Sequence, residues 1–567
     1  MAMLVHPCRS ALLAAALLAG CAAGGNPGGV AGNGVTAGPA PRATASGAYL
    51  AGRFASAETD TKGAADQMLE ALRLAPNEPE ILTRAFLAAV MDGRAEAVQL
   101  ARRLPQSELA NILLAGADGM AGRWERAEGR LRNMPRTGAA QVLQPLLLAW
   151  AQAGRGQTDA ALATLRPQVE GSRLRGLAAL HSAMIADLGS RPQEAERLAR
   201  LALAETPEAN LRMLQVLAGI LNRAGKPEEA AKLIDAIALS GDDMALLNTP
   251  RTRDALLRGR AVASAVEGMA EAELALAGAL RGQGAPELTL VLARLSLRLR
   301  PDFTPALMIA ADSLNDERHP ESALAMLRRV PDDDPFAPVV ALRRATLLDR
   351  MDRPDEAIAL LRTLSRERPE ALQPPARLGD LLRGRQRFPE AAQAYTEALS
   401  RIGEPLPQYW PLFYARGISL ERSGRWPEAE ADFHRALQLS PEQPYVLNYL
   451  GYSWVEKGLN LPEARRMLER AMELRPQDGN IADSLGWALF KMNDLPDAIR
   501  WLERAVELES RNSVINDHLG DAYWAAGRRR EAEFQWRRAL ALDPEPEEAP
   551  RISAKLRERQ ANPSATP

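Results

Sequence analysis

The side chains in this sequence that could carry chemistry are few and widely separated. Only 2 of the 567 residues are Cys and 5 are His, and the histidines stand far apart. His518 follows Asp517 and precedes Asp521, a spacing that could form an acid–base pair, although a polar residue on a helix is the plainer interpretation. Three aspartates at 332–334 could attract calcium, or simply form a solvated loop. No nucleophile motif, phosphate loop or metal-ligand spacing accompanies them, so we expect no enzyme, no metal and no cofactor.

The composition excludes further classes of partner. The chain carries 70 Lys and Arg against 72 Asp and Glu, a formal net charge of -2. Such a balance lacks the basic surface that bulk nucleic-acid binding or adsorption to a membrane surface requires. Alanine and leucine dominate while Val, Ile and Thr are sparse, which favours helix over strand. We therefore expect an all-α protein that binds neither nucleic acid nor a small-molecule substrate.

The beginning of the chain is typical of a targeting segment. Residues 1–20 contain an apolar run, 11–18, which is too short to span a bilayer and suits a signal peptide. The run ends in Leu18-Ala19-Gly20-Cys21, which resembles the bacterial lipobox. The resemblance implies that Cys21 is acylated and becomes the new N-terminus, and that Cys8 is removed. The alternatives are an ordinary secretory signal with a chance cysteine, or a cytosolic or inner-membrane protein with a false lipobox.

Residues 21–47 predict a lipidated cysteine followed by a flexible tether. The stretch is rich in Gly, Ala and Pro and holds one charge, Arg42, so it cannot bury a core. A coil of that length reaches roughly 30 Å r.m.s.. The residue after Cys21 is Ala22 rather than Asp, which by resemblance to enterobacterial sorting favours the outer membrane, with the protein facing the periplasm.

The remainder of the chain repeats itself about every 34 residues. Four glycines are spaced by 34, 35 and 34 residues, and two sets of alanines keep step with them: Gly417, Gly451, Gly486 and Gly520; Ala429, Ala464, Ala498 and Ala532; Ala436, Ala471, Ala505 and Ala539. Apolar residues at helical spacing surround these positions, and such small residues let two helices approach closely. Gly424, Gly458 and Gly527 fall at the turn between the helices. The pattern resembles the tetratricopeptide repeat (TPR), which implies an all-α superhelical solenoid of helix-turn-helix units.

The register extends upstream with lower fidelity and gives about fourteen units between residues 48 and 544. Beyond the signal peptide and tether, we predict a degenerate N-terminal array (48–239), an irregular break or extra helix (240–269), a C-terminal array (270–544), and a capping helix and tail (545–567). The break could present a basic helix face, although a solvated face is the plainer interpretation: Arg251, Arg253, Arg258 and Arg260. Little room remains for a catalytic domain, so a TPR-linked glycosyl transferase is the least favoured function.

Aromatic residues are concentrated in the last third, where 19 of the 26 Phe, Trp and Tyr lie at or after Phe388. In TPR proteins the first helix of each unit lines the concave surface, and its fifth, ninth and thirteenth positions tend to face the groove. By resemblance, the candidate partner-binding residues are Tyr414, Asn448, Tyr452, Asp483, Trp487, Lys491, Asp517 and Asp521, with Trp524 one position away. Aromatic anchors beside polar groups suit peptide recognition, although Tyr452 and Trp487 could instead pack against neighbouring helices.

The lipobox, tether and repeats together resemble TPR outer-membrane lipoproteins of Gram-negative bacteria. The resemblance implies a lipid-anchored periplasmic interaction scaffold. In some members of that class it implies an adaptor that presents peptidoglycan hydrolases to a carboxyl-terminal processing protease. The alternative is an envelope assembly factor for pili, secretion or polysaccharide export. The expected partners are proteins or peptides in the concave groove, and the expected membrane contact is through the lipid alone.

Overall fold

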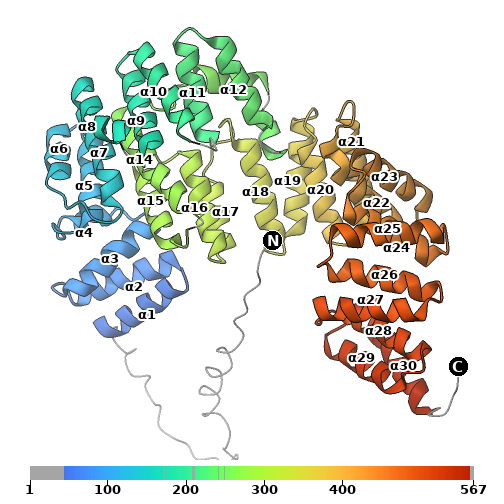
Figure 1. Cartoon of the computed structure of the whole chain (residues 1–567). Coiled ribbons are helices and arrows are strands. Elements are labelled where there is room, and N and C mark those ends of the chain that lie inside the picture. Colours follow the sequence, from blue (N-terminus) through green and yellow to red (C-terminus); the bar gives the residue numbers. More distant parts are fainter. Residues whose placement is uncertain are drawn as a thin grey trace, which may run out of the picture.

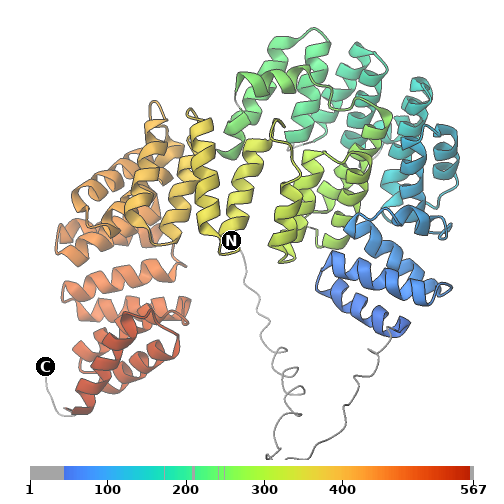
Figure 2. The ribbon, with the colours of Figure 1, turned by 180° about the vertical axis from the view of Figure 1, so that it is seen from behind.

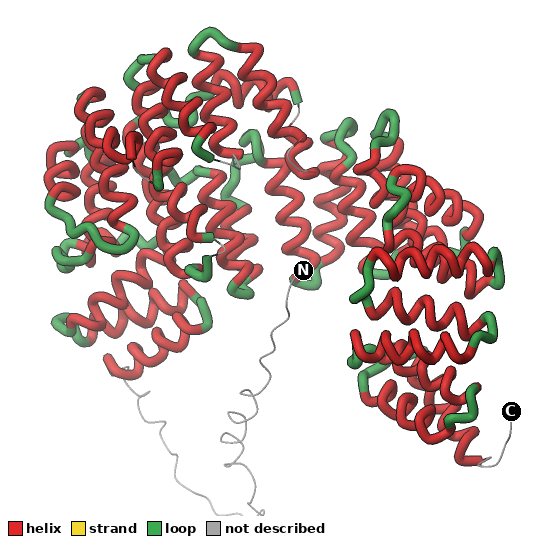
Figure 3. The backbone as a smooth tube through the Cα atoms, viewed as in Figure 1, coloured by secondary structure: helices red, strands yellow, loops and turns green. Residues whose placement is uncertain are grey.

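The computed structural model describes residues 44–171, 173–206, 211–239, 242–247, 249–281 and 283–561. Every regular element in these ranges is a helix, thirty of them α-helices and two of them short 3-10 helices (Figure 3). The all-α expectation is therefore confirmed. The predicted signal peptide, Cys21 and residues 22–43 of the tether lie outside the described residues, as do residues 562–567.

The helices pair along the chain into hairpins. When α13 and α30 are set aside, the other twenty-eight α-helices form fourteen consecutive hairpins, which confirms the predicted solenoid. The first six hairpins comprise α1 (Ala45–Ala57), α2 (Thr61–Leu74), α3 (Pro79–Asp92), α4 (Ala97–Ala101), α5 (Glu108–Met120), α6 (Trp124–Arg132), α7 (Ala140–Gly154), α8 (Thr158–Gly171), α9 (Arg175–Leu188), α10 (Pro192–Ala204), α11 (Leu211–Arg223) and α12 (Pro227–Leu239).

The second part of the chain begins with the elements η1 (Asp242–Leu247) and α13 (Pro250–Arg258). Two hairpins follow: α14 (Ala265–Leu280), α15 (Pro286–Leu299), α16 (Thr304–Asp316) and α17 (Pro320–Leu327). The last six hairpins and the final helix comprise α18 (Ala337–Arg350), α19 (Pro354–Glu367), α20 (Gln373–Gly384), α21 (Phe388–Ser400), η2 (Pro407–Tyr409), α22 (Trp410–Arg422), α23 (Trp426–Leu439), α24 (Pro444–Lys457), α25 (Leu461–Leu474), α26 (Gly479–Lys491), α27 (Leu495–Leu508), α28 (Ser513–Ala525), α29 (Arg529–Ala541) and α30 (Glu548–Ala561).

The repeated glycines and alanines account for the close packing within each hairpin. A Cβ atom on Gly486 would lie 2.7 Å from Cγ of Leu502 and 3.0 Å from its backbone nitrogen, so only glycine fits there. On the facing helix, Ala498 and Ala505 are completely buried. The turn residue Gly458 has φ +66°, the left-handed conformation expected between the helices.

Substituting Gly486 with alanine is expected to lower the free energy of unfolding by about 1–3 kcal/mol, because the new methyl group overpacks the α26–α27 contact. Gly129 is the matched control, since it also lies within a helix but has open space where a Cβ would stand. Gly129→Ala should stabilise α6 by up to about 1 kcal/mol. Thermal melts of both variants measure these effects. Equal effects of the two substitutions would show that the close approach at Gly486 does not constrain the hairpin.

The inner face of the first six hairpins is covered by a later part of the same chain. These hairpins curve into an arc, and α14–α17 lie within it in both views (Figures 1 and 2). Helix α14 packs on α5, α7 and α9, and α15 packs on α3 and α5. All four of these partners are first helices of their hairpins, the row that lines the inner surface of a repeat solenoid. Helices α14 and α15 therefore occupy the inner face of the N-terminal array, the surface on which a repeat solenoid would otherwise bind a partner.

Large buried side chains hold this seam together. Trp150 of α7 is completely buried, and a Cβ atom on Gly268 of α14 would lie only 2.2 Å from its ring. The Trp150 indole donates a hydrogen bond from Nε1 to Nδ1 of His181 at 3.0 Å. Burial lowers the pKa of His181 to about 3, so the imidazole stays neutral and accepts this bond. On the same face of α14, Glu271 pairs with Arg212 of α11.

The irregular region between the arrays contains η1 and α13. The described arginines of its expected basic face have acidic neighbours: Arg253 pairs with Asp235, Arg258 with Asp254, and Arg260 with Asp187. The side chain of Arg251 lies outside the described residues. Element η1 packs on α18 and α20, where Asp243 meets Arg377 at 3.0 Å. Because η1 also packs on α12, these contacts connect the end of the N-terminal array to α18 and α20.

Helices α18–α30 form an arm that leaves the arc (Figure 1). Helix α30 covers the last hairpin, and its Ile552 is buried in one apolar cluster with Leu519 and Trp536. Between Thr44 and Ala561, leaving aside the undescribed gaps, none of the helices is both long and apolar enough to cross a bilayer.

Candidate functional site

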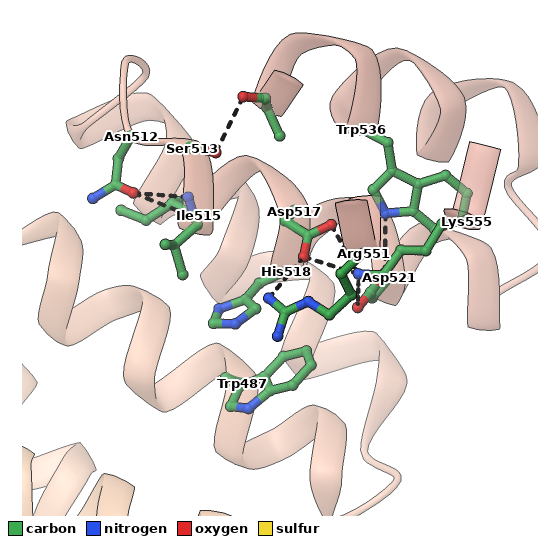
Figure 4. Close-up of polar contacts among 12 residues, drawn as sticks. Trp487, Asn512, Ser513, Ile515, Asp517, His518, Asp521, Trp536, Arg551 and Lys555 are labelled. Atoms are coloured by element: carbon green, nitrogen blue, oxygen red, sulfur yellow. Dashed lines mark hydrogen bonds and ion pairs between the residues drawn. The ribbon is translucent and has the colours of Figure 1, made fainter. Parts of the chain in front are cut away.

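The candidate site is the inner surface of the last hairpins, built by first helices α24, α26 and α28 together with α30. We call it the C-terminal groove and define it by Tyr452, Glu456, Asp483, Trp487, Lys491, Asp517, His518, Asp521, Arg551 and Lys555. Neighbouring first helices touch through these side chains, and Figure 4 shows Arg551 and Lys555 reaching toward α28. The charge of Arg551 on α30 also acts on Tyr452 of α24.

A buried imidazole joins α26 to α28 at the centre of the groove. Nδ1 of His518 lies 3.0 Å from both carboxylate oxygens of Asp483. The Trp487 ring stacks on the His518 ring with the centroids 4.0 Å apart and the planes 14° apart. Burial lowers the pKa of His518, but the carboxylates of Asp483, Asp517 and Asp521 more than offset this and raise it above the ordinary value. The protonated imidazolium form of His518 is therefore favoured, so Trp487 stacks on a ring that is paired with the Asp483 carboxylate.

The stability of these helices is therefore expected to depend on pH. Because the pKa of His518 is raised on folding, its contribution is fully present below its unfolded value of about 6.5 and is lost as pH rises through the folded value. The variant His518→Gln should melt below the wild type at pH 6, and the difference should shrink toward pH 8.5. His434→Gln is the control, since His434 packs against Trp454 rather than a carboxylate. A difference that persists or grows with pH would contradict the ion pair.

A second charged network ties α30 to α28. Lys555 Nζ lies 2.8 Å from Asp517 and 2.7 Å from Asp521, and Arg551 lies 3.5 Å from Asp517. Asp517 is only 1% exposed, so these two cations supply the countercharge that its burial requires. Trp536 donates from Nε1 to Asp521 at 2.9 Å. The network holds the final helix across the end of the groove.

The less buried part of the groove combines aromatic and charged side chains. The half-buried Trp487 donates from Nε1 to Glu456 at 2.6 Å. Lys491 is exposed. Its Nζ lies 5.0 Å from the centroid of the Trp487 ring and 3.7 Å from Oε1 of Glu456. Tyr452 is half-buried, and burial together with Glu456 and Asp483 raises its pKa. Aromatic faces with adjacent donors and acceptors are suited to holding a peptide backbone and an apolar side chain.

The other three predicted residues, Tyr414, Asn448 and Trp524, are not among the side chains that define the groove. Tyr414 packs within an aromatic cluster, with its ring 5.9 Å from Tyr449, and burial raises its pKa to about 12. Asn448 is half-buried, and its Oδ1 has no hydrogen-bond partner among the described residues. Trp524 faces the second helix of its own hairpin, where Arg529 covers its ring at 3.7 Å. The structure thus brings together six of the nine predicted residues and places these three at or beyond the edge.

Closeness in the sequence does not identify the partners that complete the groove. His518 follows Asp517 and precedes Asp521, but its hydrogen-bond contact is to Asp483, 35 residues away. Lys555 lies 34 residues from Asp521. Both separations equal the repeat period, so a search for opposite charges one period apart would have found them.

The described residues offer no group of three or more His, Cys, Asp or Glu that could hold a metal ion. Within the aspartate run, Asp334 accepts hydrogen bonds from the Thr304 hydroxyl and the Phe336 amide, both at 2.7 Å, and so stabilises the turn before α18. The groove combines charged, aromatic and hydrogen-bonding side chains.

Comparison with known proteins supports the repeat assignment. Tetratricopeptide repeat models match residues 342–407, 410–443 and 457–513, so these segments carry tetratricopeptide repeats. No curated protein matches the chain. Among solved structures, it is similar to the APC/C hetero-tetramer Cut9-Hcn1 at 15% identity, covering 91% of this chain and 96% of that chain with a TM-score of 0.36. It is also similar to yeast Tom70 (15% identity, 91% and 96% covered, TM-score 0.34) and to a tetratricopeptide repeat protein from Parabacteroides merdae (16% identity, 43% and 95% covered, TM-score 0.37).

Proposed function

We propose that this tetratricopeptide-repeat solenoid is a non-catalytic scaffold that binds a protein or peptide in its C-terminal groove. The observation that carries the proposal is the difference between the two inner faces. Helices α14 and α15 cover the inner face of the N-terminal array, whereas Tyr452, Trp487 and Lys491 line the inner face of the last hairpins. A solenoid recognises partners through such an extended concave surface.

The groove favours a partner segment that carries both an apolar side chain and polar backbone. Trp487 and Tyr452 offer aromatic surface, while Glu456, Lys491 and Arg551 offer one acceptor and two donors around it. An extended peptide presents backbone N–H and C=O groups on alternate sides, which such a mixed lining can satisfy. We therefore expect a short linear segment of a larger protein rather than a flat surface.

The proposed site of action is the periplasmic face of the outer membrane, with the protein anchored through lipid on Cys21. This part of the proposal rests on the sequence Leu18-Ala19-Gly20-Cys21 and on the tether after it. The adaptor role that the resemblance implies, delivering peptidoglycan hydrolases to a processing protease, would use the groove for one of those two proteins. An envelope assembly factor is the second candidate, since it would use the same anchor and groove.

Affinity capture from cell envelopes after crosslinking tests this function with the full-length chain. The expected result is the recovery of a protease, a hydrolase or an envelope assembly component, lost in Trp487→Ala and Tyr452→Ala. Recovery of no envelope protein would contradict the scaffold role. Labelling with palmitate tests the anchor separately: it should occur in the wild type and be lost in Cys21→Ser, and labelling that persists in the variant would refute lipidation at Cys21.

A further inference from the structure

A cluster of arginines lies at the seam between the N-terminal array and the folded-back helices. It surrounds a cavity of about 370 Å³. One wall comes from the end of α3 and from α5, including Val90, Asp92 and Leu113, and the other from α15 and the segment after α17. The arginines that line the cavity are Arg94, Arg294, Arg298 and Arg329. The two walls are far apart in the sequence and meet only because α14–α17 fold back into the arc.

The two arginines of α15 that line the cavity, Arg294 and Arg298, each have a guanidinium Nε without an acceptor among the described residues. Arg294 is only 9% exposed, its Nε has no hydrogen-bond partner among the described residues, and its Nη1 lies 3.4 Å from the sulfur of Met326. Arg329 approaches the same sulfur at 4.0 Å and donates from Nη2 to the Pro301 carbonyl at 2.9 Å. Arg298 is half-buried, and its Nε likewise has no partner in the described chain. A thioether is a weak acceptor, so Met326 does not satisfy the buried Arg294.

Acidic residues do not balance this charge. Asp92 is the one acid lining the cavity, and it is already bound by Arg94 at 2.5 Å. Within the described ranges, Arg294, Arg298 and Arg329 have no carboxylate within 4.0 Å. Burial lowers the pKa of Arg294 to about 10; the charge of Asp92 opposes this effect and that of Arg329 adds to it. The side chain is still protonated at neutral pH, and Asp92, which is shared with Arg94, acts on it only from beyond ion-pair distance.

We propose that this cavity binds a phosphate group, either as the free ion or as the head of a small phosphate monoester, and that the bound anion fastens α15 to α3. Guanidinium groups match phosphate oxygens in paired hydrogen bonds. A tetrahedral oxyanion offers enough acceptors for several arginines at once. The volume is in the lower range of small-molecule sites, and the apolar walls Val90, Leu113 and Leu297 leave room for the organic part of an ester.

Binding must stabilise the seam, because the site exists only when both walls are assembled and the unfolded chain has no equivalent. Titration of inorganic phosphate into the full-length protein, with ionic strength held constant by chloride, is the first test. We expect a saturable rise of several degrees in the melting temperature of the N-terminal part. A phosphate effect no larger than that of chloride would overturn the proposal.

Substitutions of single arginines test whether the phosphate-dependent rise in melting temperature comes from this cavity. Arg298→Gln and Arg329→Gln should each abolish the phosphate-dependent rise, and both positions reach solvent, so neither substitution leaves a buried void. Arg344→Gln is the matched control, because Arg344 is also half-buried with an unpartnered Nε but lies on α18 away from the cavity. It should keep the full rise. If Arg298→Gln and Arg329→Gln kept the rise as well, the cavity would not be the site.

A second ligand distinguishes the two sources of the phosphate group. Glycerol 3-phosphate is titrated under the same conditions. An equal or larger rise would support an ester as the natural ligand, whereas a rise with inorganic phosphate alone would support the free ion. These melts report on the N-terminal seam, so they stand or fall independently of partner binding in the C-terminal groove.

Discussion

Replacing Trp150 with alanine is expected to lower the free energy of unfolding of the N-terminal part by about 3–5 kcal/mol. The indole is completely buried where α14 meets α7, and Gly268 leaves space for it that no other residue would. Its removal creates a cavity and also deprives His181 of a hydrogen-bond donor. Because the pKa of His181 is held to about 3, the imidazole cannot compensate by taking up a proton at neutral pH.

Hydrogen exchange read by mass spectrometry measures this effect helix by helix, which suits a repeat protein that opens in parts. Exchange should accelerate in α7, α9 and α14 and stay unchanged in α24–α30. Trp150→Phe is the control, since it keeps the aromatic ring and loses the N–H donor, and its effect should be clearly smaller. If both substitutions had the same effect, or if exchange rose mainly in the last hairpins, the folded-back seam would not stabilise the N-terminal array as described.

Replacing Trp487 with alanine is expected to weaken binding of the captured partner about 30-fold or more, which corresponds to at least about 2 kcal/mol. Trp487 is half-buried, is stacked on His518 and Phe490, and is held by a hydrogen bond to Glu456. A rigid aromatic side chain that is already positioned loses little entropy on binding. It therefore has the properties of a binding hot spot.

Trp501→Ala is the matched control for this affinity measurement. Trp501 is also half-buried and lies under an arginine, Arg500, but it is carried by α27, a second helix outside the inner row. It should leave the dissociation constant unchanged. Melting curves of both variants separate loss of binding from loss of fold. Comparable affinity losses in the two variants would show that the binding surface is elsewhere.

The repeats could be predicted from the sequence because their physical constraints are local. Gly486 and Gly520 must face Leu502 and Trp536 one helix later, and a Cβ on Gly520 would lie 2.5 Å from the Trp536 ring. Each such constraint recurs every 34 or 35 residues, so the pattern survives in the sequence. The all-α class and the number of hairpins follow from this pattern.

The folding back of α14–α17 could not be predicted in the same way. The sequence at 240–269 interrupts the register, and an interruption carries no information on the direction in which the solenoid resumes. The complementarity that fixes the direction, such as Gly268 against Trp150, involves single positions in distant units rather than a periodic pattern. The repeat pattern therefore does not reveal that the protein itself covers the inner face of its N-terminal array.

The groove was predicted in part. The resemblance to TPR units, whose first helices tend to face the groove at fixed positions, identified Tyr452, Asp483, Trp487, Lys491, Asp517 and Asp521. Lys555 and Arg551 were missed because α30 lies outside the repeat pattern, although it continues the row of first helices. Asp517 is buried because Lys555 of α30 packs over it, and the repeat pattern carries no information on α30.

The central claim is that the partner lies in the C-terminal groove. Site-specific photocrosslinking tests it most directly: a benzophenone amino acid replaces Lys491 in the groove or, as the control, Arg466 on the second helix α25, both of which are exposed. We predict a crosslinked partner from position 491 and none from position 466, with the 491 product lost in a chain that also carries Tyr452→Ala. Crosslinks of equal yield from both positions, or from 466 alone, would contradict it.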